Sequence, residues 1–235
     1  MGHKVHPKIY RTPVIFNWDS RWFAKKDYAK FSEQDTAIRD YITKKCKNAL
    51  IDGISVERGP KNLTITILAA KPGFVIGRSG KDLDIMRKYI ETKILKMKLR
   101  AKINVREVRS PATSAAVVAQ TIAFDIERRM PFRRVMKQTV QKVMTGGAKG
   151  VKVILAGRLN GVEIARTETV SEGKVPLITI RSNVDYATCV ARTIYGAIGI
   201  KVWVYHGETF GKSDKFEQAA KESPRKPRKR NIKKF

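Results

Sequence analysis

Apolar positions recur at strand and helix spacings along the first half of the chain. They predict a helix over 36–50, strands at 54–58 and 63–69, a helical stretch from about 81 to 97 and a strand at 102–108. In 63–69, Leu63, Ile65 and Ile67 alternate with threonines, which is typical of a strand with one buried face. This order predicts a three-stranded sheet with helices on one side.

The second half repeats the mixture of helices and strands. Helices are predicted at 112–129 and 132–144, where Pro131 separates them because proline cannot continue a helix. Strands are predicted at 151–156, 162–170 and 175–180, followed by a helix at 184–195 and a strand at 198–204. We therefore expect an α+β protein whose second, α/β domain contains a mixed sheet.

A glycine-bracketed turn precedes the helical stretch of the first domain. Gly77, Arg78, Ser79 and Gly80 lead into Lys81. Glycine lets another backbone approach closely, and the first turn of a helix offers free N–H groups that suit a phosphate. A bare G-x-x-G match is more often a tight turn without a ligand. Within the order helix, strand, strand, helix, turn, helix, strand, it resembles the type II KH domain, in which this turn clamps an RNA backbone.

These patterns divide the chain into four parts. We expect an N-terminal arm at 1–35, a KH type II domain at 36–109, a second α/β domain at 110–208 and a basic, disordered tail at 209–235. In the arm, aromatic residues alternate with basic ones. They are consistent either with a strand-like edge that packs on the next domain or with RNA contact.

Charge narrows the class of partner. The chain of 235 residues has 49 Lys and Arg against 21 Asp and Glu, a formal charge of +28. Such a charge needs a polyanion close by, first of all nucleic acid and second an anionic membrane. No apolar run is long enough to span a bilayer. With nucleic acid as the first candidate, we expect no membrane partner. The histidines are scattered, and Cys46 and Cys189 lie far apart in the sequence, so we predict no metal site. We expect both cysteines to be buried, reduced thiols.

The helix at 132–144 is the second informative stretch. Between residues 128 and 162 there are nine basic residues and no acidic one. Arg133, Arg134 and Lys137 fall on one arc of this helix, opposite an apolar arc. A solvated helix usually mixes both signs, so phosphate contact explains a one-signed arc better than a merely basic exterior. Arg128 and Arg129 immediately precede it.

Several long stretches resemble the family of the third protein of the small ribosomal subunit, in its bacterial form. They are GHKVHP, KPGFVIGRSGKD, ERRMPFRRVMKQTVQKVM, GAKGVKVILAGRLNGVEIARTE, SEGKVPLITIRSNVDYA and YGAIGIKVWVYHGE, which cover the chain up to about residue 208. The resemblance implies a structural constituent of the cytoplasmic ribosome that binds rRNA in the subunit head. It also implies that the chain lines the mRNA entry tunnel beside neighbouring ribosomal proteins.

The same resemblance assigns roles to individual residues. Arg133, Arg134 and Lys137 would face incoming mRNA and help to unwind it, with Arg128 and Arg129 beside them. Further rRNA contacts are expected at six basic positions: Lys4, His6, Arg11, Lys142, Lys149 and Arg158.

Two other classes of protein compete with this interpretation. A free KH-domain RNA chaperone or transcription-elongation factor would share the G-x-x-G turn and the charge. A nuclease would need a convergent acidic cluster or a nucleophile with a base, and the sequence has no such motif. We therefore expect no enzyme activity, no catalytic residues, no cofactor and no small-molecule substrate.

Overall fold

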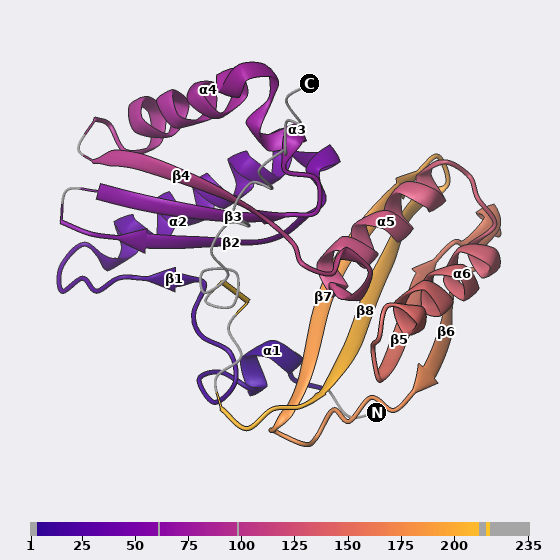
Figure 1. Cartoon of the computed structure of the whole chain (residues 1–235). Coiled ribbons are helices and arrows are strands. Elements are labelled where there is room, and N and C mark those ends of the chain that lie inside the picture. The colour runs from indigo at the N-terminus through magenta and orange to yellow at the C-terminus, as the bar shows by residue number, and fades with distance from the viewer. Residues whose placement is uncertain (1–3, 61, 98, 212–214, 217–235) are drawn as a thin grey trace, which may run out of the picture.

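The computed structural model describes residues 4–60, 62–97, 99–211 and 215–216, and it contains two α+β units that lie side by side (Figure 1). The first unit runs from β1 to β4 and the second from η4 to β8. Each unit has its own cluster of buried apolar side chains. The expected α+β class is confirmed.

The first unit is built on a mixed sheet of four strands in the order β1-β2-β3-β4. β2 and β3 are antiparallel, whereas β1 runs parallel to β2 and β4 runs parallel to β3. The elements are β1 (Ser20–Arg21), α2 (Tyr28–Lys45), η1 (Lys47–Ala49), β2 (Ile51–Arg58), β3 (Asn62–Ala69), α3 (Gly73–Ile76), η2 (Arg78–Gly80), α4 (Lys81–Tyr89), η3 (Ile90–Ile94) and β4 (Arg100–Glu107). The order of elements predicted for a KH domain is present, with the short β1 as an additional edge strand.

One face of this sheet forms the first core. Leu63, Ile65 and Ile67 of β3 are completely buried and, at a spacing of two, point to the same side. They pack in one cluster with Ile38 of α2 and Met86 of α4, so both helices cover that face. The alternation seen in the sequence therefore identified the buried face correctly.

The second unit contains a four-stranded sheet in the order β6-β5-β8-β7 with α5 and α6 packed against it (Figure 1). Its elements are η4 (Pro111–Thr113), α5 (Ala115–Glu127), α6 (Phe132–Thr145), β5 (Gly150–Gly157), η5 (Leu159–Gly161), β6 (Arg166–Gly173), β7 (Ser182–Thr193) and β8 (Gly196–Glu208). All three strand pairs are antiparallel.

The expectation of a mixed second sheet is corrected to an antiparallel one. The predicted helix at 184–195 is wrong, because this stretch is β7, which pairs with β8 along its whole length. The predicted strand at 175–180 is also wrong, since this stretch lies in the connection between β6 and β7. A hairpin between β7 and β8 needs no crossover helix, and strands joined in this way run antiparallel.

The arm differs from its prediction at its C-terminal end. α2 begins at Tyr28, eight residues before the predicted start at Thr36. Asp35 lies inside α2 and is buried. Its carboxylate accepts hydrogen bonds from Ser20 Oγ (2.8 Å), Trp22 Nε1 (2.7 Å) and Arg58 Nη2 (2.8 Å). A buried carboxylate with three donors anchors the end of the arm to the first unit.

The beginning of the arm packs on the second unit. It contains α1 (Pro7–Tyr10), which lies beside β7 (Figure 1). The ring of His6 meets the ring of Tyr186 edge-on, with 4.7 Å between the ring centroids. The arm therefore bridges both units, and its aromatic residues divide between buried Phe16 and exposed Trp18 and Phe23.

Candidate nucleic-acid interface

The G-x-x-G turn has the backbone geometry that its glycines allow. φ is +72° at Gly77, +55° at Ser79 and +78° at Gly80, all in the left-handed region. A Cβ on Gly77 would lie 2.0 Å from an Asp82 carboxylate oxygen, so no other residue fits there without rearrangement. α3 and α4 fix the turn from both sides and leave Arg78, Ser79 and Lys81 exposed.

Apolar side chains that the sequence analysis did not single out lie on the elements that flank this turn. Phe74 is 61% exposed and Ile76 39% exposed on α3, and Ile85 is 54% exposed on α4. In proteins that bind single-stranded nucleic acid, exposed aromatic side chains beside basic groups are the surfaces on which bases stack. The signal was present in the sequence, because Ile85 lies off the apolar arc of α4.

The basic arc of α6 is exposed, as predicted. Phe132 and the other apolar residues of the opposite arc are buried in the second core. Arg133, Arg134 and Lys137 are all exposed, and among the described residues none of them forms an ion pair with a carboxylate. The guanidiniums of Arg133 and Arg166 lie 5.7 and 5.6 Å from the centroid of the Phe132 ring. This face is positive and is not neutralised by the carboxylates of the described part of the chain.

Arg128 and Arg129 form the corner between α5 and α6, and both are exposed. Arg129 has a φ of +63°. Its N–H donates to the carbonyl of Ile126 at 2.9 Å, and the N–H of Met130 donates to that of Asp125 at 3.1 Å. This is a helix-closing turn whose left-handed position is usually glycine. An arginine there costs stability but keeps a cation at the corner.

Arg11, an expected rRNA contact, is fully buried. Its Nη1 donates to the carbonyl of Pro7, and its Nη2 donates to those of Pro176, Leu177 and Thr179, each at 3.0 Å. The guanidinium therefore holds the connection between β6 and β7 against the arm. No surface of Arg11 is available to RNA in this structure.

The other expected rRNA contacts are exposed but dispersed. Lys4 and His6 lie on the arm, Lys142 on α6, Lys149 before β5 and Arg158 after β5. The Nδ1 atom of His6 accepts hydrogen bonds from two backbone N–H groups of α1 at 3.2 and 3.4 Å, and burial lowers its pKa. The Nε of Arg158 donates to a nearby loop carbonyl at 3.0 Å. The structure brings the α6 arc together with its corner, but the G-x-x-G turn belongs to the other unit.

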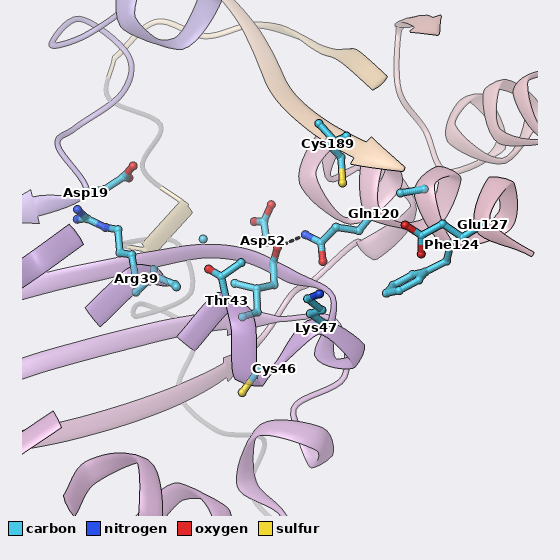
Figure 2. A pocket seen from close by; sticks show the side chains of 15 residues that line it. Asp19, Arg39, Thr43, Cys46, Lys47, Asp52, Gln120, Phe124, Glu127 and Cys189 are labelled. Carbon is cyan, nitrogen blue, oxygen red and sulfur yellow. Dashed lines mark hydrogen bonds between the residues drawn. The ribbon is translucent and has the colours of Figure 1, made fainter. Parts of the chain in front are cut away.

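A cleft of about 440 Å³ lies between the two units (Figure 2). Cys46 lines it from the first unit, and Phe124 and Cys189 line it from the second. Gln120 spans its edge by donating to the carbonyl of Ile51 at 2.7 Å. Burial raises the pKa of both cysteines, so both thiols stay protonated near neutral pH.

Over the described residues, no group of three or more His, Cys, Asp and Glu side chains is arranged to hold a metal ion. None of the described helices combines the length and apolar character that crossing a bilayer requires.

The turn, its flanking helices and the mixed sheet define an RNA-binding protein of the KH class. Residues 37–113 match the model of the KH domain family, and residues 122–204 match that of "Ribosomal protein S3, C-terminal domain".

Curated relatives extend the likeness over most of the chain. The small ribosomal subunit proteins uS3 of Paraburkholderia phymatum, Burkholderia thailandensis and Burkholderia mallei are each 45% identical to it over 215 residues, which is 91% of this chain and 80% of each relative. The chain belongs to the ribosomal protein S3 family. It is a ribosomal, RNA-binding protein rather than an enzyme, as the sequence predicted.

Proposed function

We propose that this protein is a structural constituent of the small subunit of the cytoplasmic ribosome, where it binds rRNA in the subunit head and lines the mRNA entry tunnel. Family membership supports the ribosomal role. One observation supports the entry role, namely the arc of Arg133, Arg134 and Lys137, which is exposed, of one sign and free of ion pairs among the described residues. Such an arc is suited to an RNA backbone.

The entry role needs no covalent chemistry. α6 is held rigidly because its apolar arc is buried in the second core. Its three cations would hold the phosphates of one strand, with Arg128 and Arg129 extending the basic surface at the corner. A helix fixed beside a narrow channel disfavours a duplex too wide to pass, and translocation would supply the work of separating the strands.

The KH turn would bind rRNA by a different set of contacts. Backbone groups from Gly77 to Gly80 allow close approach, and Arg78 and Lys81 add positive charge. The exposed Ile76 and Ile85 would pack against bases. Lys4, His6, Lys142, Lys149 and Arg158 are exposed and remain proposed rRNA contacts, whereas Arg11 is omitted because its side chain is buried.

Translation through a stable hairpin tests the entry role. Ribosomes that carry the variant with alanine at 133, 134 and 137 should pause longer at a strong hairpin downstream of the decoding site than wild-type ribosomes do. Speed on an unstructured message should be unchanged. Replacement of the exposed Lys25, Lys26 and Lys30 by alanine removes the same charge elsewhere and serves as the matched control. Normal speed through the hairpin in the α6 variant would refute the entry role.

Sedimentation tests the ribosomal placement against a free RNA chaperone or elongation factor. In moderate salt, the protein should co-sediment with the small subunit together with its neighbouring head proteins. Recovery at the top of the gradient would contradict the placement without affecting the KH assignment.

A further inference from the structure

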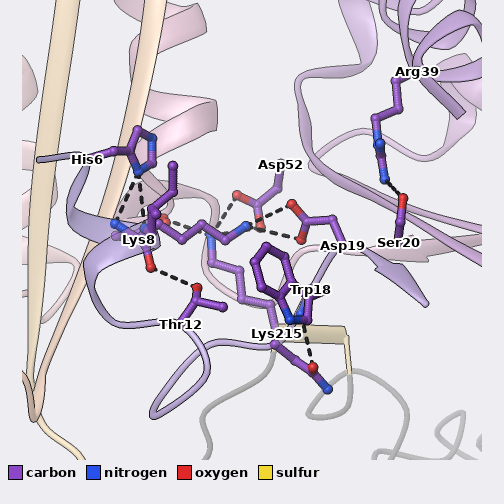
Figure 3. Close-up of polar contacts among 12 residues, drawn as sticks. His6, Lys8, Thr12, Trp18, Asp19, Ser20, Arg39, Asp52 and Lys215 are labelled. Atoms are coloured by element: carbon purple, nitrogen blue, oxygen red, sulfur yellow. Dashed lines mark hydrogen bonds and ion pairs between the residues drawn. The ribbon is translucent and has the colours of Figure 1, made fainter. Parts of the chain in front are cut away.

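A single lysine from near the C-terminus lies between the two units. Its ammonium is 2.9 Å from an Asp52 carboxylate oxygen on β2 and 2.8 Å from an Asp185 carboxylate oxygen on β7. Figure 3 shows Lys215 reaching Asp52 in this seam. Asp52 belongs to the first unit and Asp185 to the second, so one cation is shared by carboxylates of both.

The two carboxylates that share this cation are shielded from water, so their charges need a counterion. The side chains of Asp52 and Asp185 are 3% and 10% exposed, while that of Lys215 is 36% exposed. Because both carboxylates contact the same nitrogen atom, these two oxygens lie within about 6 Å of each other. Two shielded negative charges at that distance repel each other unless a cation stands between them.

Other contacts tie the same carboxylates to the start of α5. The hydroxyl of Ser114 donates to Asp52, and the N–H of Ala115 donates to Asp185 at 2.9 Å. Ser114 is also the N-cap of α5. The first turn of α5 is therefore fixed through the group of charges that Lys215 balances.

Phe216 adds an apolar contact and a backbone contact on the first unit. A Cβ placed on Gly53 would lie 3.1 Å from the Phe216 ring, so the ring packs directly on this glycine of β2. The Nη1 of Arg106 on β4 donates to the carbonyl of Phe216 at 3.2 Å. The pair Lys215–Phe216 is thus held by charge, by packing and by a hydrogen bond.

The protonation equilibria agree with this geometry. Burial alone would lower the pKa of Lys215, but the charges of Asp185 and Asp52 outweigh it and raise that pKa. Burial alone would raise the pKa of Asp185, but Lys215 and the Ala115 amide lower it overall. His206 also faces these groups, and burial lowers its pKa.

We propose that Lys215 is a positioning residue that latches the two RNA-binding units together at the seam between β2 and β7. It acts by neutralising Asp52 and Asp185, and so holds the G-x-x-G turn and the α6 arc in a fixed mutual orientation. The latch bears on the proposed function, because the two proposed RNA surfaces belong to different units. Its test uses the free, full-length protein without RNA, so failure of the latch and failure of the entry role are distinguishable.

A double-mutant cycle tests the electrostatic part. Lys215→Met should lower the Tm at pH 7 by about 5 °C, since it leaves two buried carboxylates without their cation. Asp185→Asn keeps an oxygen for the Ala115 amide, so the Lys215→Met/Asp185→Asn double variant should recover much of the loss. Lys215→Arg should stay close to wild type. Additive effects of the two single changes would overturn the proposal, because they would mean that Lys215 contributes packing only.

Two further measurements test the positioning itself. In Lys215→Met, the Ala115 amide should exchange its hydrogen faster, and small-angle X-ray scattering should show a larger maximum dimension as the seam opens. Lys88→Met removes an exposed lysine of α4 that has no ion pair among the described residues and should change neither readout. Unchanged exchange and unchanged scattering in Lys215→Met would overturn the proposal.

Discussion

Replacing Arg133, Arg134 and Lys137 by glutamine should reduce the salt dependence of RNA binding. All three side chains are exposed, and within the described part of the chain the one side-chain contact that would be lost is that of Arg133 with the Phe132 ring, at 5.7 Å. An exposed contact of this kind stabilises the fold by about 0.5 kcal/mol, so the variant should remain folded. Any large change in affinity would then reflect lost contacts to RNA.

The size of the effect follows from the number of cations. Each phosphate contact with a single strand contributes about 0.7 to the slope of log affinity against log salt, so three contacts contribute about 2. When salt rises from about 50 to 200 mM, wild-type affinity should therefore fall about 20-fold more than that of the variant. Fluorescence anisotropy with a labelled single-stranded RNA and the full-length protein measures both slopes.

A matched variant separates local contact from overall charge. Glutamine at Lys25, Lys26 and Lys30 removes the same three charges from the beginning of α2 and the preceding loop. It should leave the slope close to that of wild type. Equal slopes for the two variants would refute the idea that α6 contacts the phosphates, since net charge alone would then account for binding.

Three further predictions concern single positions. Gly77→Ala would drive a methyl group into the Asp82 carboxylate and abolish RNA binding by the turn. In Gly80→Ala the methyl group meets nothing within 4 Å, and its positive φ costs about 1 kcal/mol of stability. Equal losses of RNA affinity in the two variants would contradict this. Asp35→Ala leaves three donors without their acceptor and should lower the free energy of unfolding in urea by about 3 kcal/mol; a loss within the error of the control would contradict it. Burial lowers the pKa of His206, so below about pH 6.5 the unfolded chain binds more protons than the folded protein does. The Tm should therefore fall from pH 7 to pH 5. The plot of Tm against pH should be flatter for His206→Gln.

Sequence periodicity predicted elements whose pattern and surroundings agree. α6 has an apolar arc and a basic arc, and the structure buries the first and exposes the second. β7 was predicted as a helix because its apolar residues can be placed on a helical face as well as on a strand. Its pairing with β8 decided between the two, and the register of a distant partner is not visible in a local window.

Long-range polar contacts could not be predicted in the same way. Arg11 and Lys215 looked like surface cations in a basic arm and a basic tail. Three of the four backbone carbonyls that accept hydrogen bonds from Arg11 lie 165 to 168 positions away, and Lys215 meets Asp52 163 positions away. The proposed tail at 209–235 lies mostly outside the described residues. The proposed RNA-contacting residues, apart from Arg11, stay predictions about exposed groups.

The left-handed backbone at Arg129 has a consequence for engineering. Glycine at this position would relieve a conformational penalty of about 1 kcal/mol, so directed evolution for heat resistance alone should favour it. The more stable Arg129→Gly variant would lose a guanidinium from the corner between α5 and α6. Under the proposed role of this corner in RNA binding, thermostability screens should exclude the position, because a higher Tm there would conceal weaker binding of RNA.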